Sequence, residues 1–191
     1  MGLYRPAWGL RGPEVTEPRW PERYWGGLSV SLQGVAADTI SHLADLGRTV
    51  RVLEIYDCSD LTGGSLEPLT RCPGLRGLTL SGGVPDTVSL EPLTRCPVLR
   101  ELTLSGGVPD AVSLKPLTRL VKSCRKLWSL YLHCTADTTR AVLTALKEAD
   151  LRDSDGRPRT IDLHVPEELY DQLKSQEGDG VEVYEWEDWM R

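Results

Sequence analysis

Leucines recur along this chain at a fixed spacing of three and then two residues. The clearest copies are Leu75, Leu78 and Leu80, followed 24 positions later by Leu99, Leu102 and Leu104. Residues two apart on an extended strand point to the same side of it, and the residue between them points to the other side. We therefore expect Leu78 and Leu80 to face a core and Thr79 to face away from it.

This spacing belongs to a tandem repeat that spans residues 65–112. Two 24-residue units follow one another and differ at three positions: Gly74 against Val98, Gly77 against Glu101 and Thr87 against Ala111. A repeat of roughly 20 to 50 residues is typical of stacked architectures, in which each unit covers the apolar face of its neighbour. In each unit Ser-Gly-Gly and then a proline follow the strand, so the chain is expected to turn there.

Apolar alternation and helical spacing predict the elements along the rest of the chain. Parallel strands are expected near residues 28–32, 51–56, 76–81, 100–105, 128–133, 161–165 and 181–184. Helices are expected over residues 35–46, 117–124 and 137–151 and after Pro166. Asp137 is the expected N-cap of the third helix, and Pro166 is the expected first residue of the fourth.

This organisation resembles the leucine-rich repeat family. The resemblance rests on the L-x-x-L-x-L pattern repeated in register, with further copies at Val50, Leu53, Ile55 and Cys58 and at Leu127, Leu130 and Leu132. It implies an α/β fold, a leucine-rich repeat solenoid whose curved parallel sheet has about seven strands, with short helices and turns on the convex side. In that family the concave side of the sheet commonly binds another protein. Gly83 and Gly107 stand where the family prefers Asn or Cys, so backbone contacts are expected to hold those turns.

The repeat domain is expected to cover residues 28–184, between an irregular segment at 1–27 and an acidic aromatic tail at 185–191. The first segment carries tryptophans among prolines and charges, and the tail begins Glu-Trp-Glu-Asp-Trp. The ends of a stacked core need covering. Two interpretations therefore stay open for each segment: a cap that folds over one end of the core, or a peptide that docks onto a partner.

Charge and composition narrow the possible functions. The formal net charge is −6, which disfavours sequence-independent binding to nucleic acid because phosphates attract basic proteins. No apolar run approaches the ~18 residues of a membrane span, and the first residues do not form a secretory signal. The chain is therefore expected to be cytoplasmic, with its five cysteines reduced. Cys72, Cys96 and Cys124 each precede a strand leucine by three residues and are expected to face the core.

The sequence carries little that is typical of catalytic or metal-binding chemistry. Cysteine and histidine do not recur at a metal-ligand spacing such as C-x2-C, and the Ser-Gly-Gly turns lack the lysine of a phosphate-binding loop. We predict no cofactor and no metal. A second hypothesis, an enzyme or enzyme component, would use Cys134 together with His133 and His164. A third is a structural protein that self-associates through the exposed ends of its repeats.

The first hypothesis is a non-enzymatic module that binds a protein through the sheet face opposite the leucines. Arginine, tyrosine and tryptophan are enriched at binding hot spots, and an arginine ridge favours a partner with an acidic surface. An accessory, inhibitory or immunity subunit is the expected role, with neither nucleic acid nor membrane as partner. Glu54 alone is expected to be a solvated charge on this face. The residues expected to bind the partner are Arg51, Tyr56, Arg76, Arg100, Glu101, Trp128, Tyr131 and His133.

Overall fold

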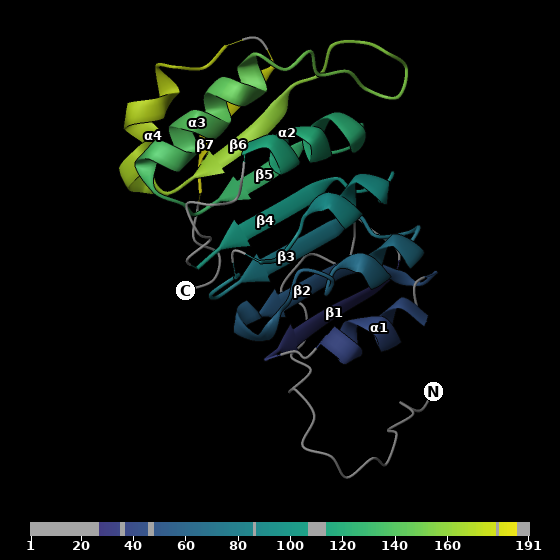
Figure 1. The fold of residues 1–191 in the computed structure, drawn as a ribbon. Helices are drawn as coiled ribbons and strands as arrows, with labels where there is room; N and C mark the ends of the chain where they lie inside the picture. The colour runs from purple at the N-terminus through teal and green to yellow at the C-terminus, as the bar shows by residue number, and fades with distance from the viewer. Residues whose placement is uncertain are drawn as a thin grey trace, which may run out of the picture.

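Seven parallel strands form one sheet in the computed structural model, which describes residues 27–34, 37–45, 48–85, 87–106, 114–178 and 180–186. The strands lie in the sheet in the order in which they occur along the chain (Figure 1). They are β1 (Leu28–Gln33), β2 (Val50–Tyr56), β3 (Gly77–Ser81), β4 (Glu101–Ser105), β5 (Ser129–Leu132), β6 (Ile161–Val165) and β7 (Val181–Glu185). The prediction of a parallel α/β sheet with seven strands is confirmed.

Helical segments connect the strands and lie on one side of the sheet (Figure 1). Two parallel strands need such a crossover, because the chain must return to the end of the sheet at which the previous strand began before it starts the next one. Within the described ranges, none of the helices is both long and apolar enough to cross a membrane. The segments are α1 (Ala37–Asp45), η2 (Cys58–Asp60), η3 (Glu67–Arg71), η4 (Glu91–Arg95), α2 (Leu114–Ser123), α3 (Ala136–Lys147) and α4 (Glu167–Lys174).

The core lies between the sheet and the helical segments. Strand register places leucines side by side across the sheet: Leu53, Leu78, Leu102, Leu130 and Leu163 form one row. Each of these five side chains is at most 1% exposed. Full burial of one leucine side chain contributes roughly 1.5–3 kcal/mol to folding, so this row is a major source of stability. The predicted core direction of the leucines is confirmed.

Backbone contacts hold the glycine turns that follow the strands, as expected. Gly82 and Gly83 have φ of 79° and 68°, and Gly106 has φ of 74°, values that a side chain disfavours. The Gly82 N–H donates to the Ser105 carbonyl at 3.1 Å, and the Cys58 N–H donates to the Gly82 carbonyl at 2.6 Å. Each turn is thereby tied to the turn of the next unit. Gly107 lies outside the described residues.

The recurrent cysteines are buried among the helical segments. The Cys96 thiol donates to the Leu69 carbonyl at 3.7 Å, and the Cys124 thiol donates to the Leu93 carbonyl at 3.2 Å, each in the preceding unit. Burial raises the pKa of Cys96 to about 11 and that of Cys124 to about 12. All five cysteines of the chain are free. The raised pKa values keep the Cys96 and Cys124 thiols protonated at neutral pH. The prediction that Cys72, Cys96 and Cys124 face the core is confirmed.

Three helix starts differ from the sequence prediction. α2 begins at Leu114, three residues before the predicted start at residue 117. The N-cap of α3 is Thr135, whose hydroxyl accepts from the Thr138 N–H at 3.4 Å, so Asp137 lies inside the first turn. A carboxylate in that position still interacts favourably with the helix dipole. Pro166 occupies the N-cap of α4, not its first helical position, because its ψ of 150° is extended. α3 ends at Lys147, four residues before the predicted end at residue 151.

Candidate functional site

Polar side chains occupy the face of the sheet opposite the core, which we call the polar face. Strand register places two rows of residues across all seven strands of this face, and a third, shorter row of Gln33, Tyr56, Ser81 and Ser105 across β1 to β4. The first row, nearer the amino ends of the strands, contains Ser29, Val52, Gly77, Glu101, Ser129, Asp162 and Glu182. The second row contains Ser31, Glu54, Thr79, Thr103, Tyr131, His164 and Tyr184.

The half of the polar face formed by β1 to β4 offers little surface for binding. Glu54 and Thr79 are each 4% exposed, and Thr103 is 6% exposed. The expectation of a solvated Glu54 is therefore wrong. The Ser31 hydroxyl donates a hydrogen bond to the Glu54 carboxylate. This bond offsets part of the cost of removing that charged group from water.

The predicted arginines do lie side by side, at the amino ends of the strands. The Arg76 N–H donates to the Arg51 carbonyl at 2.7 Å, the Arg100 N–H to the Arg76 carbonyl at 2.7 Å, and the Trp128 N–H to the Arg100 carbonyl at 2.9 Å. We call these four residues the edge row. Its arginines are partly exposed, and Trp128 is 45% exposed, which is unusual for so large an apolar side chain.

Gly74 is one of the three positions at which the two repeats differ, and it lies against the Arg51 side chain. The Arg51 guanidinium lies directly against Gly74, and a Cβ there would collide with Arg51 Nη1. Arg51 Nη1 also donates to the Arg48 carbonyl at 3.0 Å. The second repeat has Val98 at the equivalent position.

An aromatic cluster covers the other half of the polar face, over β5 to β7. The Tyr131 and His164 rings stack with centroids 4.0 Å apart, and His164 stacks on Tyr184 at 5.4 Å. Trp186 follows β7, and its ring meets Tyr131 and His133 edge-on at 5.8 and 5.9 Å. Aromatic pairs in these geometries stabilise by about 0.5–1.5 kcal/mol beyond their buried area. The ring contacts therefore help to stabilise the aromatic cluster.

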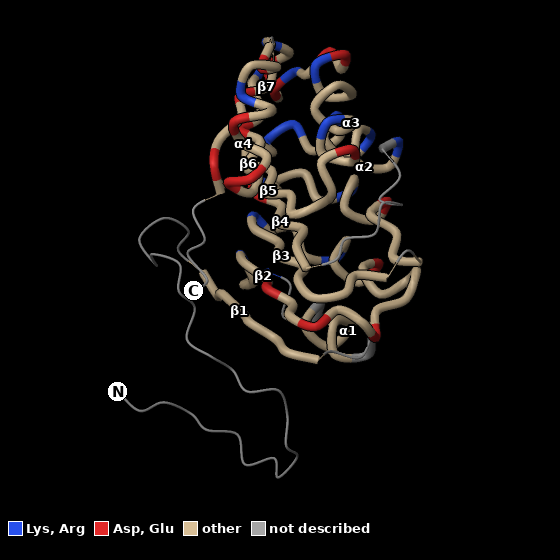
Figure 2. The backbone as a smooth tube through the Cα atoms, turned by 90° about the vertical axis from the view of Figure 1, so that its left-hand side faces the viewer, with Lys and Arg blue, Asp and Glu red and all other residues tan. Residues whose placement is uncertain are grey.

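Carboxylates flank the aromatic cluster on the first row. Burial raises the pKa of Glu101, and the neighbouring Arg100 opposes that shift. Burial also raises the pKa of Asp162, and the carboxylate of Glu182 on the next strand raises it further. The Glu182 carboxylate accepts a hydrogen bond from the Tyr184 hydroxyl at 2.7 Å. Figure 2 shows acidic positions gathered near α4 and β6, at this end of the sheet.

Lowering the pH from 6.5 to 4 is expected to reduce the stability conferred by His164. Burial lowers its pKa from 6.5 to about 4, so in that interval the unfolded chain binds a proton that the folded chain does not. Urea unfolding of the wild type and of His164→Phe at several pH values isolates this effect, because phenylalanine keeps a ring in the stack without a titrating group. The wild type should lose more stability over the interval. Equal losses would contradict the assigned environment.

The predicted binding residues thus separate into distinct places. Arg51, Arg76, Arg100 and Trp128 form the edge row, while Tyr131 and His133 belong to the aromatic cluster. Glu101 lies in the first row, one residue after Arg100. Tyr56 is on β2, in register with Ser81 of β3, three strands from Tyr131, and is partly buried. The structure does not bring Tyr56 into either group.

The residues of the enzyme hypothesis lie in different surroundings. Cys134 packs against the hydrophobic core, whereas His133 contacts Trp186 and His164 is stacked between two tyrosines on the polar face. In the part of the chain that the structure describes, no three His, Cys, Asp or Glu residues are grouped to hold a metal ion.

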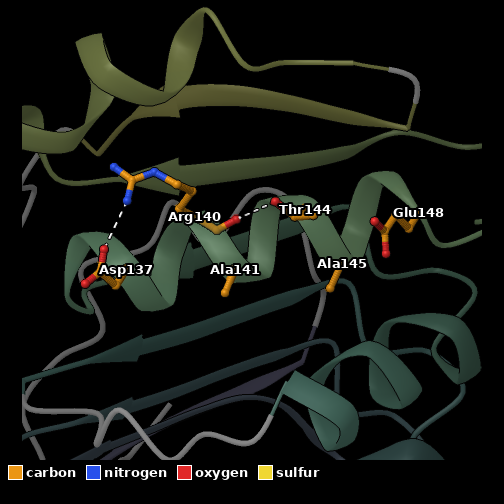
Figure 3. A pocket seen from close by; sticks show the side chains of 6 residues that line it. All are labelled: Asp137, Arg140, Ala141, Thr144, Ala145 and Glu148. Atoms are coloured by element: carbon orange, nitrogen blue, oxygen red, sulfur yellow. Dashed lines mark hydrogen bonds and ion pairs between the residues drawn. The ribbon is translucent and has the colours of Figure 1, made fainter.

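One hollow of about 460 Å³ lies on the surface of α3. Figure 3 shows Ala141 and Ala145 on the same side of the helix, between Asp137 and Glu148. The Asp137 carboxylate pairs with Arg140 at 3.0 Å, and its side chain is 97% exposed. The hollow therefore consists of one open helix surface with small side chains, without convergent polar groups.

Sequence reasoning missed several residues of the polar face, among them the serines Ser29, Ser31 and Ser129 and, at the end of the sheet, Glu182, Tyr184 and Trp186. The alternation in Val181-Glu182-Val183-Tyr184 carried the signal for two of them, because Val181 and Val183 are buried on the core side. Trp186 was assigned to the tail. The backbone N–H of Trp186 donates to the Val165 carbonyl at 2.6 Å. This bond extends the pairing with β6 by one residue beyond β7.

No protein-family model matches the chain, and a search of curated proteins gives no significant match.

Proposed function

We propose that this chain is a leucine-rich repeat solenoid without enzymatic activity that binds another protein. The near-identical 24-residue units, the leucine rows in register and the turn-to-turn hydrogen bonds support the fold assignment. An accessory, inhibitory or immunity subunit remains the role that we propose for such a module. Free thiols support a location in a reducing compartment such as the cytoplasm.

The edge row carries this proposal. Backbone hydrogen bonds link its three arginines from one strand to the next, and a further bond links the last arginine to the exposed Trp128. Arginine and tryptophan are the side chains that most often dominate binding energy, and they act best when they lie together near the centre of an interface. Guanidinium groups bind carboxylates with two parallel hydrogen bonds. The partner surface is therefore proposed to present aspartate or glutamate to the edge row.

Replacing Arg76 and Arg100 with glutamate is expected to abolish partner binding while leaving the fold intact. Both side chains are partly exposed at the amino ends of β3 and β4, so the change reverses the charge of the edge row without opening the core. Removing one member of a buried, hydrogen-bonded charge pair at an interface costs about 2–5 kcal/mol of binding free energy, which is more than a tenfold loss of affinity. Affinity capture from the lysate of the native host, with the bound proteins identified by mass, measures the effect.

The matched control is Lys115→Glu with Lys122→Glu, which makes the same change of charge on two exposed lysines of α2. A protein captured by the wild type and by the α2 variant, and lost with the edge-row variant, supports the proposal. Equal capture by all three proteins contradicts it. Circular dichroism of each variant shows whether the fold is kept.

A further inference from the structure

The edge row begins beside the point where the N-terminal segment joins the sheet. The Leu28 N–H donates to the Thr49 carbonyl at 2.9 Å. Gly27 lies so close to the Arg51 side chain that a Cβ on it would collide with Arg51 Cγ. These contacts fix Gly27 at the amino end of β1, next to the first arginine of the edge row. The residues that precede Gly27 therefore start from this place.

A short length of chain suffices to reach along the edge row. Strands β1 to β4 are neighbours in the sheet (Figure 1), and neighbouring strands lie about 4.8 Å apart, so Arg76 is about 10 Å from β1 and Arg100 about 14 Å. An extended chain spans up to about 3.6 Å per residue. Trp20 precedes Gly27 by seven residues and can therefore lie up to about 25 Å from it.

The residues within this reach carry side chains that arginine binds well. Residues 20–25, which we call the aromatic arm, have the sequence Trp-Pro-Glu-Arg-Tyr-Trp, with three aromatic rings among six residues. A planar guanidinium stacks on aromatic faces and pairs with a carboxylate in its own plane. The charge of Arg23 cancels that of Glu22, so ring stacking, and not net charge, provides most of the complementarity to the edge row.

The far end of the edge row offers apolar surface to such an arm. Trp128 is 45% exposed, and among the described residues no ring contact or cation–π contact involves its indole. Arg125 and Lys126, just before it, are exposed as well. A large exposed apolar side chain among basic residues is typical of a surface that another polypeptide segment covers.

The acidic aromatic tail starts from the wrong end of the sheet to compete for this place. The backbone N–H of Trp186 donates to the carbonyl of Val165, the last residue of β6, and the edge row lies at the opposite, amino ends of the strands. Asp188 follows Trp186 by two residues and lies at most about 7 Å from it. Arg76 lies four strands from β7, about 19 Å across the sheet. Within one molecule, the N-terminal segment is therefore the better candidate.

We propose that the aromatic arm docks along Arg51, Arg76 and Arg100 of its own molecule and competes with the partner for the edge row. This inference rests on the proposed function, because it assigns a regulation to the same site. A tethered segment acts at a millimolar effective concentration, so an intrinsic dissociation constant of about 1 mM keeps about half of the molecules docked. The partner then binds the other half, and its apparent affinity falls about twofold.

Photo-crosslinking within the purified full chain tests the docking without any partner. Benzoylphenylalanine in place of Trp20 keeps a ring in the aromatic arm, and mass spectrometry of the digested protein locates its crosslinks. Crosslinks to the peptides that contain Arg76 and Arg100 are expected. In the Arg76→Glu/Arg100→Glu background they should fall at least about fivefold, because two guanidinium groups are lost. The Lys115→Glu/Lys122→Glu background should keep them.

The origin of the arm is settled by mixing equal amounts of isotopically light and heavy protein before irradiation. Crosslinks that join peptides of the same isotope only support docking within one molecule. Crosslinks that join light and heavy peptides would show that the arm of a second copy is bound, and would overturn the inference. Equal crosslinking with and without the two arginines, or crosslinks confined to other surfaces, would overturn it as well.

Competition with the partner has its own readout. Trp20→Ser with Trp25→Ser removes two rings of the aromatic arm and should raise capture of the edge-row-dependent partner about twofold. Trp8→Ser removes a tryptophan outside the arm and should leave capture unchanged. Capture that depends on Arg76 and Arg100 but does not rise in the double tryptophan variant would refute the competition and leave the proposed function standing.

Discussion

Leu102→Ala is expected to lower the free energy of unfolding by about 2–5 kcal/mol. Leu102 is 0% exposed and lies between Leu78 and Leu130 in the central row of the core. Removing its side chain takes contacts from both neighbouring units, and a stacked core cannot collapse around the cavity without moving them. Urea unfolding followed by circular dichroism measures the change.

Leu28→Ala is the matched control, because Leu28 is 42% exposed at the start of β1. Its loss should change the free energy of unfolding by less than about 1 kcal/mol. An unchanged unfolding midpoint for Leu102→Ala would mean that the leucine rows do not face the core as described.

Arg159→Ala is expected to destabilise the fold by about 2–3 kcal/mol. Its guanidinium donates from Nη1 to the Leu127 carbonyl and from Nη2 to the Val121 carbonyl at 2.5 Å, and Nη2 also lies 3.4 Å from the Cys124 carbonyl. These carbonyls lie at the end of α2 and in the turn before β5, where the helix itself provides no donors. Chemical unfolding of the variant measures the loss.

Arg157→Ala provides the comparison, since Arg157 is exposed two residues earlier and should be nearly neutral. Arg159→Lys should recover only part of the stability, because an ammonium lacks the planar fork that reaches several carbonyls at once. Full recovery with lysine would show that charge alone, and not the geometry of the guanidinium, stabilises the end of α2.

The sequence predicted the sheet well because its signal is repeated. Leu78 and Leu102 occupy equivalent positions in two nearly identical units, so a strand assigned once is assigned twice, and parallel neighbours in register follow from stacking. The same logic placed Arg76 and Arg100 side by side. It also predicted that the glycine turns are held by backbone contacts, because glycine has no side chain to hold them.

Features that depend on single side chains could not be predicted in this way. The N-cap of α3 fell on Thr135, since both Thr135 and Asp137 are good caps and only the path of the chain after β5 chooses between them. The burial of Glu54 depends on Ser31, which is 23 residues away in the sequence. The contact of Trp186 with His133 likewise joins residues whose separation no local pattern encodes.

The most direct test of the central claim is photo-crosslinking from the edge row. A benzoylphenylalanine introduced at Trp128 lies on the exposed end of that row, and one at Ser154 lies in an exposed turn after α3. We predict a crosslinked partner from position 128 in the host lysate, none from position 154, and loss of the crosslink when Arg76 and Arg100 are changed to glutamate. Crosslinking from position 154 alone, or from position 128 regardless of the two arginines, would contradict binding through the edge row.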